Sequence, residues 1–221
     1  WLLNLSDGSL KKYLDQFNHH DLKIMSLYQD RQGFIWAGTF NYGVFRIRPA
    51  DGTWIRITEQ EGLVNNNVLS ISGHLDTLWL ATLGGASEIV LQPDQDGQPF
   101  RISSYNRETG LVSNFIYSVY EDNSDQIWFG TDGDGISVKT KTGWRTYNEN
   151  DGLTDDVIYS ITGDHFGNIW IASASKGLFK FNQDKFFHFG LEEGLSNLDI
   201  TGITTIQDEV MIINDNGFDI L

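Results

Sequence analysis

The side chains best suited to chemistry in this chain are carboxylates in two short stretches. Asp132 and Asp134 alternate with glycines, and Asp155 and Asp156 are adjacent. Two carboxylates about 5 to 10 Å apart across a cleft can serve as the acid and base of a glycosidase. Carboxylates also bind Ca²⁺, but an EF-hand loop counted from Asp132 lacks the Glu at its twelfth position. Turn formation, ligand contact and catalysis all stay open, and we predict no catalytic residue and no metal site.

Other reactive residue types lack the spacing that chemistry requires. The chain contains no Cys, which excludes disulfides, thiolate metal sites and cysteine nucleophiles. Its five His residues show neither HExxH nor another metal-binding spacing. No residue pattern indicates a cofactor, and we expect none.

A repeated pattern runs through the chain and must position these residues. A Gly or Ala follows a Trp or Val by seven residues in six copies, which begin at residues 1, 36, 79, 128, 170 and 210. The copies are therefore 35, 43, 49, 42 and 40 residues apart, within the range of propeller blades. The second anchor is a Gly-Leu pair followed by a branched apolar residue and a Ser. It occurs at Gly62, Gly110 and Gly152, with a diverged copy at Gly194.

Each copy contains four short β-strands, here called A to D. In the copy that begins at Gly152, these strands are expected over 157–161, 168–172, 177–181 and 185–189. Between A and B, Asp164 and Gly167 supply turn chemistry, because Asp bonds to its own backbone and Gly adopts positive φ. The Ser after the Gly-Leu pair falls on strand A, which is innermost in a propeller. Ser26, which no Gly-Leu pair precedes, and Gly202 occupy the matching positions. We therefore interpret Ser26, Ser70, Ser118, Ser160 and Gly202 as small residues at a crowded centre, and none of the four Ser as a nucleophile.

The predicted fold is an all-β propeller of four-stranded antiparallel blades. Six anchors indicate about six blades' worth of chain, with incomplete first and last blades. We expect one propeller segment over 1–221, cut from a larger ring. Its predicted parts are a partial blade at 1–19, blades at 20–62, 63–110, 111–152 and 153–194, and a partial blade at 195–221.

Charge and hydropathy exclude several partners. With 15 Lys and Arg against 30 Asp and Glu, the formal net charge is −15, which repels a phosphate backbone. We therefore expect no nucleic-acid partner. No apolar run approaches the roughly 18 residues that span a bilayer, so membrane contact is expected only through segments absent from this sequence.

The combined pattern resembles the two-component regulator propeller repeat. The best matches are Gly62 to Ile71, Asp30 to Thr39 and Trp128 to Thr131. The resemblance implies the periplasmic sensor region of a membrane-bound hybrid histidine kinase, in which paired propellers precede a β-sandwich, a membrane span and the kinase core. It further implies that the signals are breakdown products of complex polysaccharides, and it brings no shared catalytic residues. A homodimer of the full-length sensor is a further expectation.

The D-to-A and B-to-C loops of a propeller emerge on one face, where a rigid scaffold presents them to ligands. Aromatic rings there can stack on a sugar, and Asn and Asp can bond to its hydroxyls. Phe40 and Tyr42 are favoured, because an aromatic residue in a Gly-flanked loop has no obvious core to fill. The predicted ligand-binding residues are Phe40, Asn41, Tyr42, Asn66, Asn114, Asp132, Asp134, Asp155, Asp156 and Lys176.

These observations favour a non-enzymatic, carbohydrate-binding sensor in two-component signal transduction, with an oligosaccharide as its ligand. One alternative is a polysaccharide lyase or hydrolase that uses Asp132, Asp134, Asp155 and Asp156. A raised carboxyl pKa in a deep pocket would favour that enzyme. Another alternative is a scaffold for protein partners, which a broad exposed aromatic patch would favour.

Overall fold

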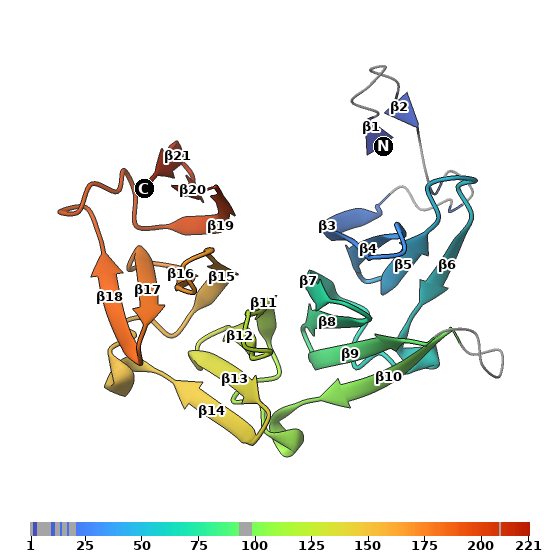
Figure 1. Ribbon diagram of the computed structural model, residues 1–221, viewed down its shortest axis with the longest axis horizontal. Helices are drawn as coiled ribbons and strands as arrows, with labels where there is room; N and C mark the ends of the chain where they lie inside the picture. The colour runs from blue at the N-terminus through green and yellow to red at the C-terminus, as the bar shows by residue number, and fades with distance from the viewer. Residues whose placement is uncertain are drawn as a thin grey trace.

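The chain was analysed as a computed structural model that describes residues 2–3, 10–11, 14, 17, 21–92, 99–207 and 209–221. Five β-sheets stand side by side in an open arc, with their first strands toward the middle (Figure 1). Each sheet is one blade, and its strands pair antiparallel in chain order. The all-β propeller prediction is therefore confirmed.

Four blades have four strands each, and the fifth has three. Blade 1 comprises β3 (Lys23–Gln29), β4 (Ile35–Phe40), β5 (Val44–Ile47) and β6 (Trp54–Ile57). Blade 2 comprises β7 (Val68–His74), β8 (Thr77–Thr82), β9 (Gly85–Leu91) and β10 (Phe100–Tyr105). Blade 3 comprises β11 (Ile116–Glu121), β12 (Ile127–Thr131), β13 (Ile136–Thr140) and β14 (Gly143–Tyr147). Blade 4 comprises β15 (Ile158–Gly163), β16 (Ile169–Ser173), β17 (Leu178–Asn182) and β18 (Lys185–Phe189), and blade 5 comprises β19 (Ile200–Ile206), β20 (Glu209–Asn214) and β21 (Gly217–Ile220).

The number of blades differs from the prediction of about six. In the region of the expected first partial blade, the described strands are β1 (Leu2–Leu3) and β2 (Leu10–Lys11), which pair with each other over two residues each. Trp1 and Gly8, the anchors of that copy, lie outside the described residues. A Trp-to-Gly interval does not by itself specify a blade, because a blade needs further strands to pair with it.

An Asp at the A-to-B turn fixes the buried Trp of three blades. In blade 1, Asp30 Oδ1 accepts hydrogen bonds from the backbone N–H of Gln32 at 3.0 Å and Phe34 at 2.9 Å, while Oδ2 accepts from Trp36 Nε1 at 2.9 Å. Asp122 and Asp164 bond to Trp128 and Trp170 in the same way, each at 2.8 Å. The predicted turn is therefore also the anchor of the Trp, which the sequence did not reveal.

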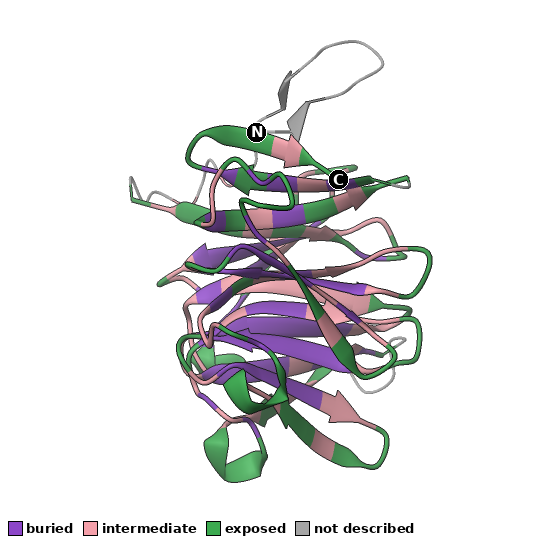
Figure 2. Ribbon diagram, turned by 90° about the vertical axis from the view of Figure 1, so that its left-hand side faces the viewer, coloured by how far each residue is buried: buried purple, intermediate pink, exposed green. Residues whose placement is uncertain are grey.

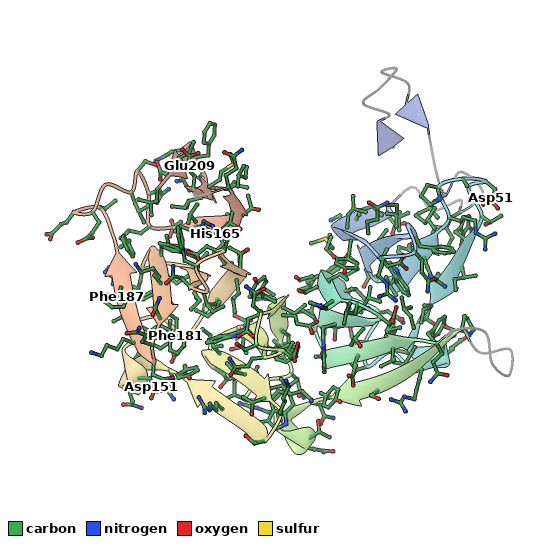
Figure 3. All side chains as sticks on the ribbon, viewed as in Figure 1. Asp51, Asp151, His165, Phe181, Phe187 and Glu209 are labelled. Carbon is green, nitrogen blue, oxygen red and sulfur yellow. The ribbon has the colours of Figure 1, made fainter. Side chains whose placement is uncertain are left out.

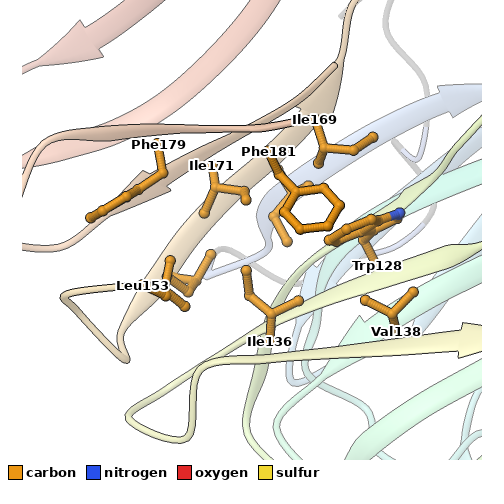
Figure 4. Close-up of a cluster of buried hydrophobic side chains, with 10 residues drawn as sticks. Trp128, Ile136, Val138, Leu153, Ile169, Ile171, Phe179 and Phe181 are labelled. Atoms are coloured by element: carbon orange, nitrogen blue, oxygen red, sulfur yellow. The ribbon is translucent and has the colours of Figure 1, made fainter. Parts of the chain in front are cut away.

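The space between neighbouring blades is filled by apolar side chains from both sheets. Between blades 3 and 4, Trp128 and Ile136 lie against Ile171 and Phe181 (Figure 4). Leu153 of the Gly-Leu pair enters the same cluster, and it is fully buried. Buried residues concentrate within the sheets, and exposed residues lie in the loops and on strands such as β3 and β21 (Figure 2). Adjacent sheets thus bury the faces that they turn toward each other, as in a propeller, whereas the end of the arc leaves Phe218 and Ile220 of blade 5 exposed.

The innermost strand of each blade carries a β-bulge beside its small residue. The pairing register shifts between Ile24 and Ser26, and the same shift recurs at the equivalent place in the other four blades. A Cβ added to Gly38 would lie 2.6 Å from Ser26 Oγ, so the centre is crowded, as predicted. By contrast, Phe187 on the outermost strand β18 lies at the rim and is exposed (Figure 3).

Candidate functional site

The B-to-C turn of one blade contacts the D-to-A loop that leads to the next blade. The backbone N–H of Gly43 donates to the carbonyl of Asn66 at 2.8 Å, and that of Gly135 donates to the carbonyl of Asp156 at 2.9 Å. Gly177 bonds to Leu198 in the same way at 3.0 Å. The two kinds of loop therefore share one face, as expected.

Three of the D-to-A loops contain a 3-10 turn closed by a capping box. The turns are η1 (Glu59–Glu61), η2 (Arg107–Thr109) and η3 (Glu149–Asp151). Gly62 ends the first turn at φ 112°, a conformation that favours Gly, and the next residue, Leu63, is buried. The Gly-Leu pair thus ends the turn and anchors the loop between blades.

The B-to-C turn of blade 2 is one residue shorter than those of blades 1, 3 and 4. Thr82 Oγ1 donates to the carbonyl of Gly85, three residues later, whereas Thr39 Oγ1 donates to Gly43, four residues later. Gly85 is therefore the equivalent of Gly43, and the assignment of that position to Ala86, seven residues after Trp79, is wrong. Among the described residues, no bond of the kind made by Gly43 joins Gly85 to Asn114.

A hollow of 460 Å³ lies at this place, which we call the second-junction hollow. Its walls come from the short turn, from the D-to-A loop between blades 2 and 3, and from the B-to-C turn of blade 3. Its lining residues are Leu83, Gly84, Arg107, Ser113, Asn114, Phe115, Asp132 and Asp134. It brings together three of the predicted ligand-binding residues, namely Asn114, Asp132 and Asp134.

The charged groups of the second-junction hollow differ in how they are engaged. Arg107 Nη2 donates to Asp134 Oδ1 at 3.1 Å, and Arg107 Nε donates to the carbonyl of Val112 at 2.6 Å. Asp132 is exposed, and its carboxylate lies close enough to Tyr117 to affect the pKa of that hydroxyl. Burial, together with the nearby Asp132 carboxylate, raises the pKa of Tyr117 to about 12. Phe115 is 53% exposed, so the hollow combines an open ring face with acceptor oxygens.

Asn114 and Asn66 hold their own loops together. Asn114 Oδ1 accepts from the backbone N–H of Arg107 at 2.8 Å, and Asn66 Oδ1 accepts from that of Glu59 at 3.0 Å. Both residues lie seven positions after their partner. These amides close the 3-10 turns, and contact with a ligand stays a prediction for both.

The predicted residues of blade 1 do not form an open site with the others. The Tyr42 ring packs edge-on against Phe17, with centroids 5.4 Å apart, and its hydroxyl donates to Asp21 at 2.8 Å. The interpretation that Tyr42 has no core to fill is therefore wrong, because residues that precede β3 form a small apolar cluster beside it. Asn41 has φ 74° and donates its backbone N–H to Asn67 Oδ1, while Phe40 ends β4 and is half-buried.

The remaining predicted residues lie at the junction of blades 3 and 4. Asp155 Oδ2 accepts from the backbone N–H of Ser175 at 2.8 Å and from its hydroxyl at 3.0 Å. Asp156 lies directly behind the second-junction hollow, since its carbonyl accepts from Gly133 and Gly135. Burial and the nearby Glu149 raise the Asp156 pKa, with smaller effects from Asp155 and Asp134. Lys176 is exposed.

Two residues near the hollow were missed by the sequence analysis, and one was underrated. Arg107 was not considered, because no repeat feature marks it. Tyr117 falls between the branched residue and the Ser of the repeat, a position that we interpreted only as strand. Phe115 belongs to a D-to-A loop but was not among the predicted ligand-binding residues. An aromatic residue next to the expected loop face was the available signal for both Phe115 and Tyr117.

Neither a metal site nor a membrane span was found in the described part of the chain. No group of three or more His, Cys, Asp or Glu residues there could hold a metal ion. Likewise, none of its helices has the length and apolar character needed to cross a membrane.

Residues 20–41, 110–133 and 152–175 match the family model described as "two component regulator propeller". These segments are similar to that repeat. They include the A-to-B turns of Asp30, Asp122 and Asp164, together with most of the B-to-C turn of blade 3. No curated protein has a sequence that matches the chain.

Solved structures share the propeller architecture. The extracellular domain of BT3049 from B. thetaiotaomicron, named as a hybrid two component system, aligns with a TM-score of 0.75 and 22% identity over 90% of this chain and 27% of that one. The extracellular domain of BT4673 from the same organism, named as a one component system, aligns with a TM-score of 0.72 and 20% identity over 90% of this chain and 28% of that one. Virginiamycin B lyase from Staphylococcus aureus aligns with a TM-score of 0.68 and 14% identity over 99% of this chain and 75% of that one. At these identities the likeness concerns the fold, and this chain spans little more than a quarter of the first two proteins.

Proposed function

We propose that this chain is the ligand-sensing propeller of an extracytoplasmic two-component sensor, and that it binds an oligosaccharide in the second-junction hollow. The two component regulator propeller repeats and the likeness to extracellular domains of two component systems support the sensor role. The observation that carries the site is the hollow itself, where a shortened turn leaves 460 Å³ of space beside polar and aromatic side chains.

The chemistry of the hollow suits a sugar. The exposed Phe115 ring offers a face on which a pyranose can stack, and Asp132 offers oxygens that accept from its hydroxyls. Arg107 is held by Asp134 and Val112, so its remaining N–H groups are positioned in advance to donate. Binding in such a preorganised site costs little ordering entropy.

Signalling follows if the ligand binds two arrangements of the sensor unequally. The hollow is bounded by loops of blades 2 and 3, so a bound sugar contacts both blades and stabilises one relative placement of them. A ligand shifts such an equilibrium only by its difference in affinity for the two states. We propose that this chain is the periplasmic part of a longer sensor protein and that the shift is transmitted to a histidine kinase in that protein.

The second candidate function is an enzyme, because a lyase shares the fold over 99% of this chain. In that case Asp132 and Asp134 act on the bound polysaccharide rather than only holding it. Turnover of a saccharide would distinguish this function from sensing.

The test is a calorimetric screen of the purified chain with tetrasaccharides of cellulose, xylan, mannan and chitin, and with tetramannuronate and tetragalacturonate. An Asp132→Ala, Phe115→Ala double variant removes the open side chains of the hollow. An Asn41→Ala, Tyr42→Ala double variant alters the equivalent turn of blade 1 and serves as the matched control. We expect saturable binding that the first variant loses and the second keeps, with no product formed. Product formation would support the enzyme, and failure of every saccharide to bind would refute the proposed ligand class.

A further inference from the structure

Two tyrosines occupy β-bulges on adjacent inner strands. The pairing of β11 with β12 skips Tyr117, and the pairing of β15 with β16 skips Tyr159. A bulge leaves one residue outside the ladder and changes the direction in which its side chain points. The strands β11 and β15 are neighbours on the concave side of the arc (Figure 1), and the two tyrosine rings lie close together.

The bulges themselves do not require tyrosine. The equivalent bulge residues of blades 1, 2 and 5 are Met25, Leu69 and Thr201, and the register shift is the same there. The side chain at this position is therefore set by something other than strand geometry. Tyr159 is 42% exposed, so it does not fill a core either.

The two rings and one carboxylate form a continuous surface. The ring centroids of Tyr117 and Tyr159 are 5.6 Å apart with the planes tilted by 43°. Asp132 lines the second-junction hollow, and its backbone contacts hold it beside the strands that carry the two tyrosines. Backbone contacts fix this arrangement, because Asp132 donates its N–H to the carbonyl of Phe115 and bridges to Val157 of the next blade. The tyrosine pair thus extends the hollow toward the centre of the arc.

The charges around this surface select against an anionic ligand. Asp132 and Asp134 line the hollow, and the carbonyl of Asp156 accepts from Gly133 and Gly135 next to them. The one cationic residue of the lining, Arg107, already bonds to Asp134 at 3.1 Å. The chain as a whole carries a formal charge of −15. A carboxylate or sulfate on the ligand would therefore be repelled, whereas a neutral ring with hydroxyl donors would not.

We propose that Tyr159, Tyr117 and Asp132 form a subsite for one ring of a neutral sugar chain, continuous with the second-junction hollow. The ring stacks on the exposed face of Tyr159, and its hydroxyls donate to Asp132. This subsite rests on the proposed oligosaccharide function. In it the bound sugar chain runs from the second-junction hollow toward the concave side of the arc.

The experiment compares Tyr159→Ala with Thr201→Ala, the same bulge position in blade 5. Calorimetric titrations use the four neutral tetrasaccharides above and tetramannuronate, which differs from mannotetraose by its C6 carboxylates. Loss of one aromatic stack weakens neutral-sugar binding by about tenfold. We expect this loss in Tyr159→Ala but not in Thr201→Ala, and weaker binding of tetramannuronate than of mannotetraose. In parallel, ¹³C-labelled tyrosine rings are followed by NMR, where Tyr117 and Tyr159 should shift on saturation and Tyr28 should not.

The outcomes separate the two proposals. If a neutral tetrasaccharide binds wild type and Tyr159→Ala with equal affinity, the subsite is wrong while the oligosaccharide-binding function stands. Preference for tetramannuronate likewise overturns the neutral subsite alone. If none of the saccharides binds the wild-type chain, the oligosaccharide function fails and the subsite fails with it.

Discussion

Aspartates at the two ends of the blades have opposite environments. At the A-to-B end, Asp30 is buried and accepts three hydrogen bonds, one of them from the indole of Trp36. At the opposite end, Asp132 is exposed, and Asp156 has a buried Oδ1 without a hydrogen-bond partner. The same residue type thus stabilises the fold at one end and stays available for ligands at the other.

The pKa values of Asp164 and Asp156 shift in opposite directions. Burial alone would raise the pKa of Asp164, but hydrogen bonds from Asn168, Trp170 and Phe166 lower it below 3.8. Burial and the charge of Glu149 raise the pKa of Asp156 above 3.8, and its buried Oδ1 has no hydrogen-bond partner to offset them. An Asp in a turn is therefore structural where donors converge on it, and this difference can be tested one residue at a time.

The largest effect is expected from Asp30→Ala. The change leaves the fully buried Trp36 indole N–H without its acceptor and removes the partner of Arg46, whose Nη2 lies 3.6 Å from Asp30 Oδ2. Breaking such a buried pair costs about 3 to 5 kcal/mol. Urea unfolding should show this loss for Asp30→Ala and less than about 0.5 kcal/mol for Asp132→Ala. Equal losses in the two variants would contradict the division between the ends.

The second-largest effect is expected from Asp164→Asn, whose loss of stability should depend on pH. The folded pKa of Asp164 is below its unfolded value of 3.8, so the ionised carboxylate stabilises the fold. This stabilisation is fully present above pH 3.8 and is lost as the pH falls through the folded pKa. We expect the variant to be less stable by about 1 to 2 kcal/mol at pH 7. The difference should shrink below pH 3.8, as followed by denaturant unfolding at a series of pH values. A difference that stays constant down to pH 2 would be inconsistent with this assignment.

Asp156→Asn should raise the free energy of unfolding at neutral pH, whereas Asp164→Asn should lower it. The equivalent residues are Asn66 and Asn114, whose amide oxygens accept a backbone hydrogen bond, so an amide suits this position and removes the repelled charge. Since the folded pKa is raised, the wild-type penalty is present at neutral pH and vanishes below the unfolded value of 3.8. The gain at pH 7 is small, about 0.5 to 1 kcal/mol, because the group is partly solvated. A melting temperature of the variant below that of wild type at pH 7 would refute this expected gain in stability.

The smallest effect on stability is expected from lengthening the short turn of blade 2. One Asn inserted between Leu83 and Gly84 gives this turn the length of the others and fills the second-junction hollow. The free energy of unfolding should change by less than about 0.5 kcal/mol, since surface loops tolerate insertions. Saccharide binding should be lost, while the same insertion after the exposed Lys141 should leave it intact. If the turn variant still binds the saccharide, the second-junction hollow is not the binding site.

The sequence predicted the repeated framework better than the site. The turn formed by the Asp and the small size of the inner Ser each satisfy a local rule of backbone or packing, so both could be inferred from spacing. The hydrogen bond from the Trp to that Asp and the 3-10 turn that the Gly-Leu pair ends could not. The number of blades depends on strand pairing, and the anchors of the first copy did not determine it. The role of Tyr42 depended on Phe17 and Asp21, which lie outside its repeat position. The hollow was missed because a fixed interval after Trp79 concealed the one-residue deletion before Gly85.

The most direct test of the central claim is an NMR map of backbone amides during titration with the tetrasaccharide that binds best in the screen. The account predicts shifts at Leu83, Phe115 and Asp132 around the second-junction hollow. It predicts none at the A-to-B end, where a second hollow of 130 Å³ is lined by Asp122, Asn123 and Asp164. Shifts confined to that second hollow would contradict the account, because they would place the ligand among the aspartates that hold the fold.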